Sequence, residues 1–144
     1  MRIVLDTNSL IIALSSKNKY GVVWKAFLEG RYTLCVSNEI LEEYVEVIGR
    51  NLSPTLADMV AYAILLHKNV ERIDPHFRFC LITADADGNK FVDCAIIAGA
   101  KYFVTEDRHF NVLKEIQFPK VEIVGIDRIA EMLLSWAQAE VAII

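Results

Sequence analysis

Short, mostly apolar runs recur along this chain and are separated by segments with helical periodicity. Each run holds four or five residues, contains β-branched or aromatic side chains and is bounded by polar residues, a pattern typical of buried strands. The predicted strands are 2–5, 32–36, 70–73, 102–105 and 121–124. Because strands that alternate with helices form parallel sheets, the chain is predicted to be an α/β protein with a central, mostly parallel sheet.

The segments between these runs carry apolar residues at helical spacing and residues that begin or end helices. The predicted helices are 8–15, 20–29, 38–48, 54–67, 90–100, 108–116 and 127–138. Gly30 and Gly49 are expected to end two of them. Residues 74–89 contain Asp, Pro and Gly and are predicted to form a long loop, with the apolar stretch 79–82 docked on the core.

Length and composition limit the classes of protein to which the chain can belong. Its 144 residues predict one domain, and 54% hydrophobic residues exclude intrinsic disorder. A formal net charge of −4 excludes a global basic field that would draw the protein onto nucleic acid. No segment approaches the roughly 18 uninterrupted apolar residues of a membrane helix, and Asp6 interrupts the only early apolar stretch, so neither a membrane span nor a signal peptide is expected.

The three cysteines are odd in number and widely spaced. Cys35 lies in a predicted strand, Cys94 in a predicted helix and Cys80 in the loop. This pattern favours reduced, mostly buried thiols over a disulfide or zinc site and predicts a cytoplasmic protein.

Acidic residues follow the ends of two predicted strands. Asp6 comes directly after the run 2–5, and Asp107 follows the run 102–105. In a parallel sheet the carboxyl ends of strands border the crevice where ligands bind, so two carboxylates there predict a site for a hard, oxygen-liganded cation. Each residue has an alternative role, because an Asp between a strand and a helix is also a good helix N-cap.

Three further acids are candidate ligands. Glu43 lies at the edge of the apolar stripe of its predicted helix, from which it could reach a crevice, although Glu39, Glu42 and Glu46 form a run typical of a solvated face. Asp87 precedes the helix predicted at 90–100, which it could cap, and Asp93 lies inside that helix, where a solvated surface acid is the alternative. A calcium loop is excluded because no Glu stands at the position that an EF-hand requires.

The chemistry of clustered carboxylates connects these residues. Several carboxylates within a few ångströms repel one another, and Mg²⁺ or Mn²⁺ relieves that repulsion with all-oxygen ligation. One or two such ions can activate a water against a phosphodiester. The sequence offers no Ser-His-Asp or Cys-His arrangement and no Gly-rich phosphate loop as an alternative.

In four regions that hold these acids, the chain resembles the PIN domain family. This family consists of metal-dependent ribonucleases and includes the toxins of bacterial toxin–antitoxin pairs. The matching regions, which occur in the order of the family's motifs, are Val4-Leu5-Asp6-Thr7-Asn8, residues 37–44, residues 87–95 and Val104-Thr105-Glu106-Asp107. The similarity spans roughly residues 2–130. The resemblance implies a PIN-like three-layer α/β/α sandwich, with Asp6, Glu43 and Asp107 as three members of the acidic quartet.

The third member of the quartet departs from the family pattern. PIN domains usually carry a second Asp directly after the residue that matches Asp87, and here Gly88 stands at that position. Asp87 is the preferred substitute and Asp93 the reserve, and a weakened nuclease is expected. Asn8 and Thr105 are near enough in sequence to hydrogen-bond Asp6 and Asp107 and so to orient these ligands. Turn and cap roles are equally open for both residues.

The leading hypothesis is therefore a Mg²⁺- or Mn²⁺-dependent endoribonuclease, acting as the toxin of a two-component module. Asp6, Glu43, Asp87 and Asp107 would be its catalytic metal ligands. The alternative is a non-catalytic module of the same fold that binds RNA or protein. The resemblance implies single-stranded or structured RNA as substrate, a small antitoxin protein as partner and a homodimer. The tail 139–144, which ends in four apolar residues, is expected either to fray or to dock on a partner.

Overall fold

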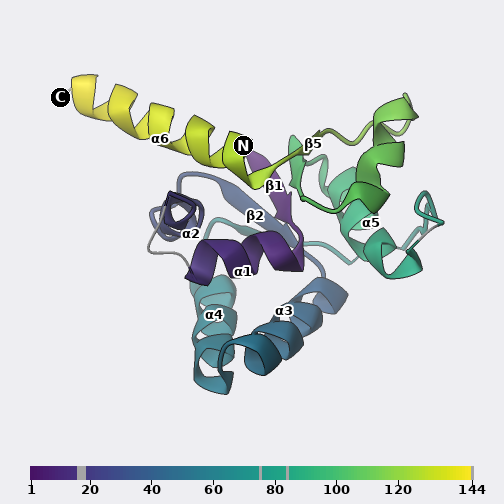
Figure 1. The fold of residues 1–144 in the computed structure, drawn as a ribbon, viewed down its shortest axis with the longest axis horizontal. Helices are drawn as coiled ribbons and strands as arrows, with labels where there is room; N and C mark the ends of the chain where they lie inside the picture. Colours follow the sequence, from purple (N-terminus) through teal and green to yellow (C-terminus); the bar gives the residue numbers. More distant parts are fainter. Residues whose placement is uncertain (16–18, 75, 84, 144) are drawn as a thin grey trace.

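A five-stranded sheet forms the centre of the protein (Figure 1). The computed structural model describes residues 1–15, 19–74, 76–83 and 85–143. The strands are β1 (Arg2–Leu5), β2 (Thr33–Val36), β3 (Val70–Arg72), β4 (Tyr102–Val104) and β5 (Ile123–Val124). Their order is β3-β2-β1-β4-β5 and every neighbouring pair is parallel, which confirms the predicted α/β sheet.

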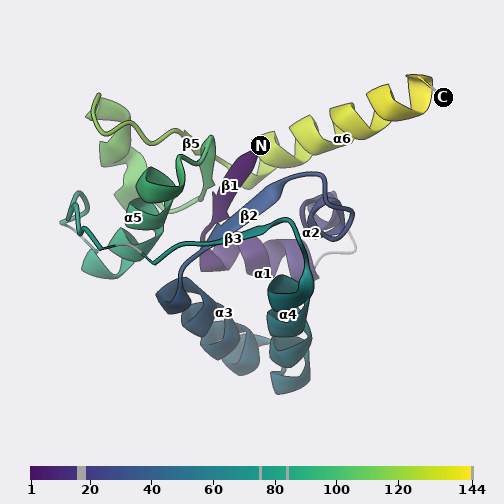
Figure 2. The same ribbon diagram turned by 180° about the vertical axis from the view of Figure 1, so that it is seen from behind.

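Helices cover both faces of this sheet, so the three-layer arrangement is also confirmed (Figures 1 and 2). One face carries α1 (Thr7–Ser15), α2 (Gly21–Leu28), α3 (Asn38–Asn51) and α4 (Pro54–Leu66). The other face carries α5 (Asn89–Ala98), which follows the short 3₁₀ turn η1 (Ala86–Gly88), and the 3₁₀ segment η2 (Arg108–Glu115). The sheet is therefore buried on both sides, as its near-continuous apolar strands require.

The order of the strands places a topological switch point beside β1. The chain adds β2 and then β3 on one side of β1, and it returns through α5 to place β4 on the other side. Ligands of open α/β sheets bind where the direction of the crossovers reverses, outside the carboxyl ends of the strands. Leu5 pairs with Val104 at that point, and the Asp6 backbone N–H donates to the Val104 carbonyl at 3.1 Å, so Asp6 and Thr105 both lie at this edge.

Glycines end some helices but not others. Gly30 and Gly99 adopt left-handed backbone angles (φ 75° and 62°) just beyond α2 and α5, a conformation that glycine adopts without strain. The prediction that Gly49 ends its helix is wrong, because α3 continues to Asn51. A Cβ at Gly49 would lie 3.8 Å from the Cβ of Ala57, so this glycine lies where α3 packs closely against α4.

The C-terminal helix α6 (Ile126–Ile143) is longer than predicted. It buries Ile126, Ile129, Ala130 and Leu133, which recur at helical spacing, and it packs against α2. Beyond these residues the helix extends away from the sheet (Figure 1). The backbone is helical through Ile143, and Ile144 lies outside the described residues.

Two other differences concern local structure near the C-terminus. The helix predicted at 108–116 is the 3₁₀ segment η2, which ends at Glu115, and β5 begins at Ile123 instead of Val121. Cys35 and Cys94 are buried free thiols, whereas Cys80 is exposed. Among the helices of the described ranges, none combines the length and apolar character needed to cross a membrane.

Asn89 fastens the long loop before α5 to the start of that helix. Its side chain accepts a hydrogen bond from the Ile82 N–H and donates one to the Ile82 carbonyl, both at 2.9 Å, while the Ile82 side chain is buried. Residues 79–82 therefore dock on the core as predicted, and the Asn89 amide is one of the groups that hold them. This loop leads directly to Asp85 and Asp87.

We expect Asn89→Ala to lower the free energy of unfolding by about 1–3 kcal/mol, because both Ile82 backbone groups lose their partner. Helix propensity would oppose this loss, since Ala is the better helix former. Denaturant titration measures the change, and Asn111→Ala, at an exposed position of η2, is the control. Equal stabilities of Asn89→Ala and the control would show that the loop is held by other contacts.

Candidate metal centre

A cavity of about 290 Å³ lies at the carboxyl edge of the sheet, beside the switch point. Five carboxylates line it, contributed by the residue after β1, by α3, by the segment before α5 and by the segment after β4. They are Asp6, Glu43, Asp85, Asp87 and Asp107. Four of the acids predicted as ligands thus line one cavity, although they come from distant stretches of the chain.

Asp6 is the most buried acid of the cavity, with 6% of its surface exposed. Its Oδ1 accepts a hydrogen bond from the Ser9 N–H at 2.7 Å, so it also caps α1, and its Oδ2 accepts one from the Thr105 hydroxyl. Burial raises the pKa of Asp6, the hydrogen bonds from Thr105 and Ser9 oppose that rise, and the charge of Asp107 adds to it. A nearby cation would therefore stabilise the ionised form.

Thr105 connects the two acids that follow β1 and β4. Its hydroxyl donates to Asp6 and accepts a hydrogen bond from the Asp107 backbone N–H at 3.0 Å. One buried side chain therefore sets the positions of both acids relative to each other. Asn8, the other residue predicted to support Asp6, is exposed on the cavity wall.

Asp107 belongs to a small cluster at the outer side of the cavity. Its Oδ1 accepts from the His109 N–H at 2.9 Å, which caps η2, and lies 3.0 Å from His109 Nδ1. His109 Nδ1 is also 4.0 Å from Asp85 Oδ2, and one ligand atom from each of the three residues lies within 4.8 Å of the others. Asp85 was not predicted, although it stands two residues before Asp87 in the same acidic stretch.

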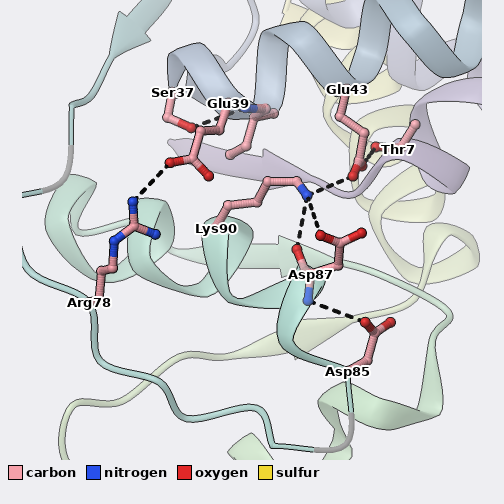
Figure 3. A network of polar contacts seen from close by, with 9 residues as sticks. Thr7, Ser37, Glu39, Glu43, Arg78, Asp85, Asp87 and Lys90 are labelled. Atoms are coloured by element: carbon pink, nitrogen blue, oxygen red, sulfur yellow. Dashed lines mark hydrogen bonds and ion pairs between the residues drawn. The ribbon is translucent and has the colours of Figure 1, made fainter.

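Glu43 reaches the cavity because the neighbouring Tyr44 is fixed in the core by burial and a hydrogen bond. The Tyr44 side chain is fully buried and its hydroxyl donates to the Leu5 carbonyl, which orients this turn of α3 toward the end of β1. Glu43 Oε2 then accepts a hydrogen bond from the Thr7 hydroxyl. Its Oε1 lies 2.7 Å from Lys90 Nζ (Figure 3).

Asp87 lies at the mouth of the cavity, with 89% of its side chain exposed. Its backbone N–H donates to Asp85 Oδ1 at 3.3 Å, and its own Oδ1 lies 3.8 Å from Lys90 Nζ. Figure 3 shows the Lys90 ammonium between Asp87 and Glu43. Lys90 is largely buried, whereas Arg108 and His109 are exposed. Lys19 pairs with Asp127, and Lys17 lies outside the described residues.

Comparison with known proteins identifies the family to which the chain belongs. A family model described as PIN domain matches residues 2–109. The chain belongs to the PIN domain family. Comparison with curated protein sequences finds no significant match.

Solved structures with the same fold include VapBC structures and a VapC toxin. DNA-bound VapBC from Salmonella typhimurium is 17% identical, with a TM-score of 0.59 over 88% of this PIN domain and 98% of that chain. VapBC2 from Rickettsia felis, bound to a promoter DNA fragment, is 16% identical, with a TM-score of 0.58 over 87% and 98%. Mycobacterium tuberculosis VapC20, a sarcin–ricin loop cleaving toxin, is 13% identical, with a TM-score of 0.51 over 72% and 87%. At these identities the likeness concerns the fold.

Asp93 lies on another side of this PIN domain's α5. It is buried, accepts a hydrogen bond from the Phe79 N–H at 3.1 Å, and burial raises its pKa. It lines a second cavity, of about 100 Å³, together with Ser37, Asn38, Glu39, Asp74, Arg78 and Lys90. The expectation of a solvated surface acid is therefore wrong, and the structure does not bring Asp93 to the other predicted ligands.

Gly88, the residue that departs from the PIN pattern, is packed against an aromatic ring. A Cβ at this position would lie 2.6 Å from Cζ and 2.8 Å from Cε1 of Phe110. Phe110 is buried and packs edge-on against Phe103, with the ring centroids 4.8 Å apart. In this PIN domain the Phe110 ring thus occupies the space that a side chain at position 88 would need.

Proposed function

We propose that this PIN domain is a metal-dependent endoribonuclease that hydrolyses RNA phosphodiester bonds as the toxin of a toxin–antitoxin pair. The observation that carries the proposal is the convergence of Asp6, Glu43, Asp87 and Asp107 on one cavity at the switch point of the sheet. These acids come from four separate parts of the chain, and their charges repel one another unless a cation is bound.

The donor set suits Mg²⁺ or Mn²⁺, because every predicted ligand offers carboxylate oxygen. Asp6 and Asp107 would hold the ion from the ends of β1 and β4, with Glu43 and either Asp87 or Asp85 completing the set. The raised pKa of Asp6 supports this assignment, since a buried carboxylate beside another acid gains from a cation. When bound, such an ion polarises water and phosphate oxygens and neutralises charge that develops on the phosphodiester.

Other residues of the chain would position these acids and the substrate. Thr105 holds Asp6 and Asp107 together, and Thr7 holds Glu43. Phe91 and Phe110 form apolar walls that limit access of bulk water to the cavity. Arg50 and Asn51 also line the cavity and offer donors to an RNA phosphate, which a protein of net charge −4 needs locally.

The proposed partner is a small antitoxin protein, because the VapBC structures with this fold are toxin–antitoxin complexes. The outer face of α4 exposes Met59, Tyr62, Leu65 and Leu66, apolar side chains of the kind that a partner protein or a second copy of the chain covers. A homodimer and a cytoplasmic location belong to the same proposal.

A thermal melt with added Mn²⁺ tests the metal site directly. At a free Mn²⁺ concentration roughly 100 times the Kd, binding to the folded state should stabilise it by about 2.7 kcal/mol, and EDTA should reverse the shift. Cleavage of single-stranded RNA should appear with Mn²⁺ and vanish with EDTA. A melting temperature that ignores both additions would favour the alternative, a non-catalytic RNA- or protein-binding module.

A further inference from the structure

The ammonium of Lys90 lies between two acids of the cavity, Glu43 and Asp87 (Figure 3). It is 2.7 Å from Glu43 Oε1, donates to the Asp87 carbonyl at 3.0 Å and is 3.8 Å from Asp87 Oδ1. Only 13% of the Lys90 side chain and 23% of the Glu43 side chain are exposed. This contact is therefore more shielded from solvent than a surface ion pair, which contributes little.

Both oxygens of Glu43 already have partners in this arrangement. Thr7 donates to Oε2, and Lys90 occupies Oε1. A divalent ion that binds Glu43 must displace the ammonium or accept a second cation within a few ångströms. Either path costs free energy, because like charges repel strongly where solvent screening is weak.

The position of Lys90 is built by its helix. Lys90 lies in the first turn of α5, where its ammonium can reach the Asp87 carbonyl, and it lies 5.5 Å from the centroid of the Phe91 ring. These contacts hold the charge near Glu43 without direct contact to Asp6 or Asp107. The ammonium thus balances the charge of Glu43, the carboxylate that α3 contributes to the cavity.

We propose that Lys90 is an internal counter-cation that holds Glu43 in the metal-free site and competes with the divalent ion for that carboxylate. Lys90 then acts as a positioning residue that sets the metal affinity of the site. This inference rests on the proposed function, because it requires that the cavity binds a divalent ion. Removing the charge of Lys90 should then raise the affinity for the divalent ion. If Lys90 merely oriented Glu43 toward the metal, the same change would lower that affinity.

The test is the affinity of the purified protein for Mn²⁺, measured by calorimetry without RNA. Lys90→Met keeps an unbranched apolar stem but removes the charge, and it should lower the Kd for Mn²⁺ by about tenfold or more, as expected for loss of a like charge a few ångströms away. Lys90→Arg retains the charge and should keep the parent affinity within a small factor. Lys101→Met, at the opposite end of β4, controls for the change in net charge.

A second readout comes from the metal-free protein. Lys90→Met should lower its melting temperature, since Glu43 loses its counter-ion, and saturating Mn²⁺ should raise the melting temperature more than it does in the parent. If Lys90→Met does not fold, Lys90→Gln supplies a neutral side chain that still donates a hydrogen bond to Glu43 and should show the same gain in affinity.

The outcomes separate this inference from the proposed function. If the parent binds Mn²⁺ and the neutral variant binds it equally tightly or more weakly, the counter-cation role is overturned. The nuclease proposal is then unaffected. Failure of the parent and of every Lys90 variant to bind Mn²⁺ would overturn both. The inference is supported if the neutral Lys90 variants bind Mn²⁺ more tightly than the parent does, while Lys90→Arg and Lys101→Met bind it as the parent does.

Discussion

Replacing Asp6 by Asn is expected to abolish cleavage of single-stranded RNA while the melting temperature of the metal-free protein stays unchanged or rises. Asp6 is the most buried acid of the cavity, and its carboxylate would be a central ligand of the ion. An amide binds Mg²⁺ or Mn²⁺ far more weakly than a carboxylate does. The amide oxygen can still accept the hydrogen bond from the Ser9 N–H that caps α1.

The direction of the stability change follows from the pKa of Asp6. Burial raises this pKa in the folded state, so between the unfolded and folded pKa values the folded protein binds more protons than the unfolded chain does. The contribution of Asp6 to stability is therefore lost as pH rises through that window, and ionised Asp6 is unfavourable at neutral pH. We expect Asp6→Asn to remove this pH-dependent loss, which thermal melts at acidic and neutral pH would measure.

The matched control is Asp127→Asn. Asp127 is exposed, its pKa is lowered by hydrogen bonds from Tyr20 and Lys19, and it lies at the start of α6. This variant should keep the cleavage rate of the parent. If Asp6→Asn cleaves RNA as fast as the parent does, the assignment of Asp6 to the catalytic site is wrong.

Introducing Asp at Gly88, which restores the residue usual in PIN domains, is expected to destabilise this protein by about 1–3 kcal/mol through overpacking. The first side-chain atom would lie 2.6 Å from Phe110 Cζ, and Phe110 is buried against Phe103, so the ring can move only by disturbing the core. The sequence by itself predicts a weakened nuclease, because Gly88 stands where the family usually carries an acid. With the Phe110 ring in place, we expect no gain from the single substitution.

Two further variants separate the steric effect from the effect of the carboxylate. Gly88→Ala meets the same ring without adding charge and should lose similar stability in a denaturant titration. Gly88→Asp combined with Phe110→Leu makes room for the new side chain and should bind Mn²⁺ more tightly than Phe110→Leu alone. Full stability of Gly88→Ala would show that Phe110 yields easily and that packing does not explain the glycine.

Much of the fold follows from patterns within short segments. Runs such as 2–5 and 102–105 are apolar on both faces, and this pattern suits only strands covered by helices on both sides. The helical stripe that includes Ile40, Tyr44 and Ile48 is buried as its spacing predicts. Gly49 was misread because a glycine inside a helix, here where α3 faces α4, has the same local sequence appearance as one that ends a helix.

The sequence determined that Asp6 and Asp107 follow neighbouring strand ends, because a parallel sheet brings its carboxyl ends to one edge. Only the tertiary structure decided the directions of side chains on α3 and before α5. It pairs Glu43 with Lys90, brings Asp85 beside His109, turns Asp93 into a separate cavity and packs Phe110 over Gly88. Local periodicity encodes which face of an element is buried, whereas these contacts depend on how segments far apart in the chain meet.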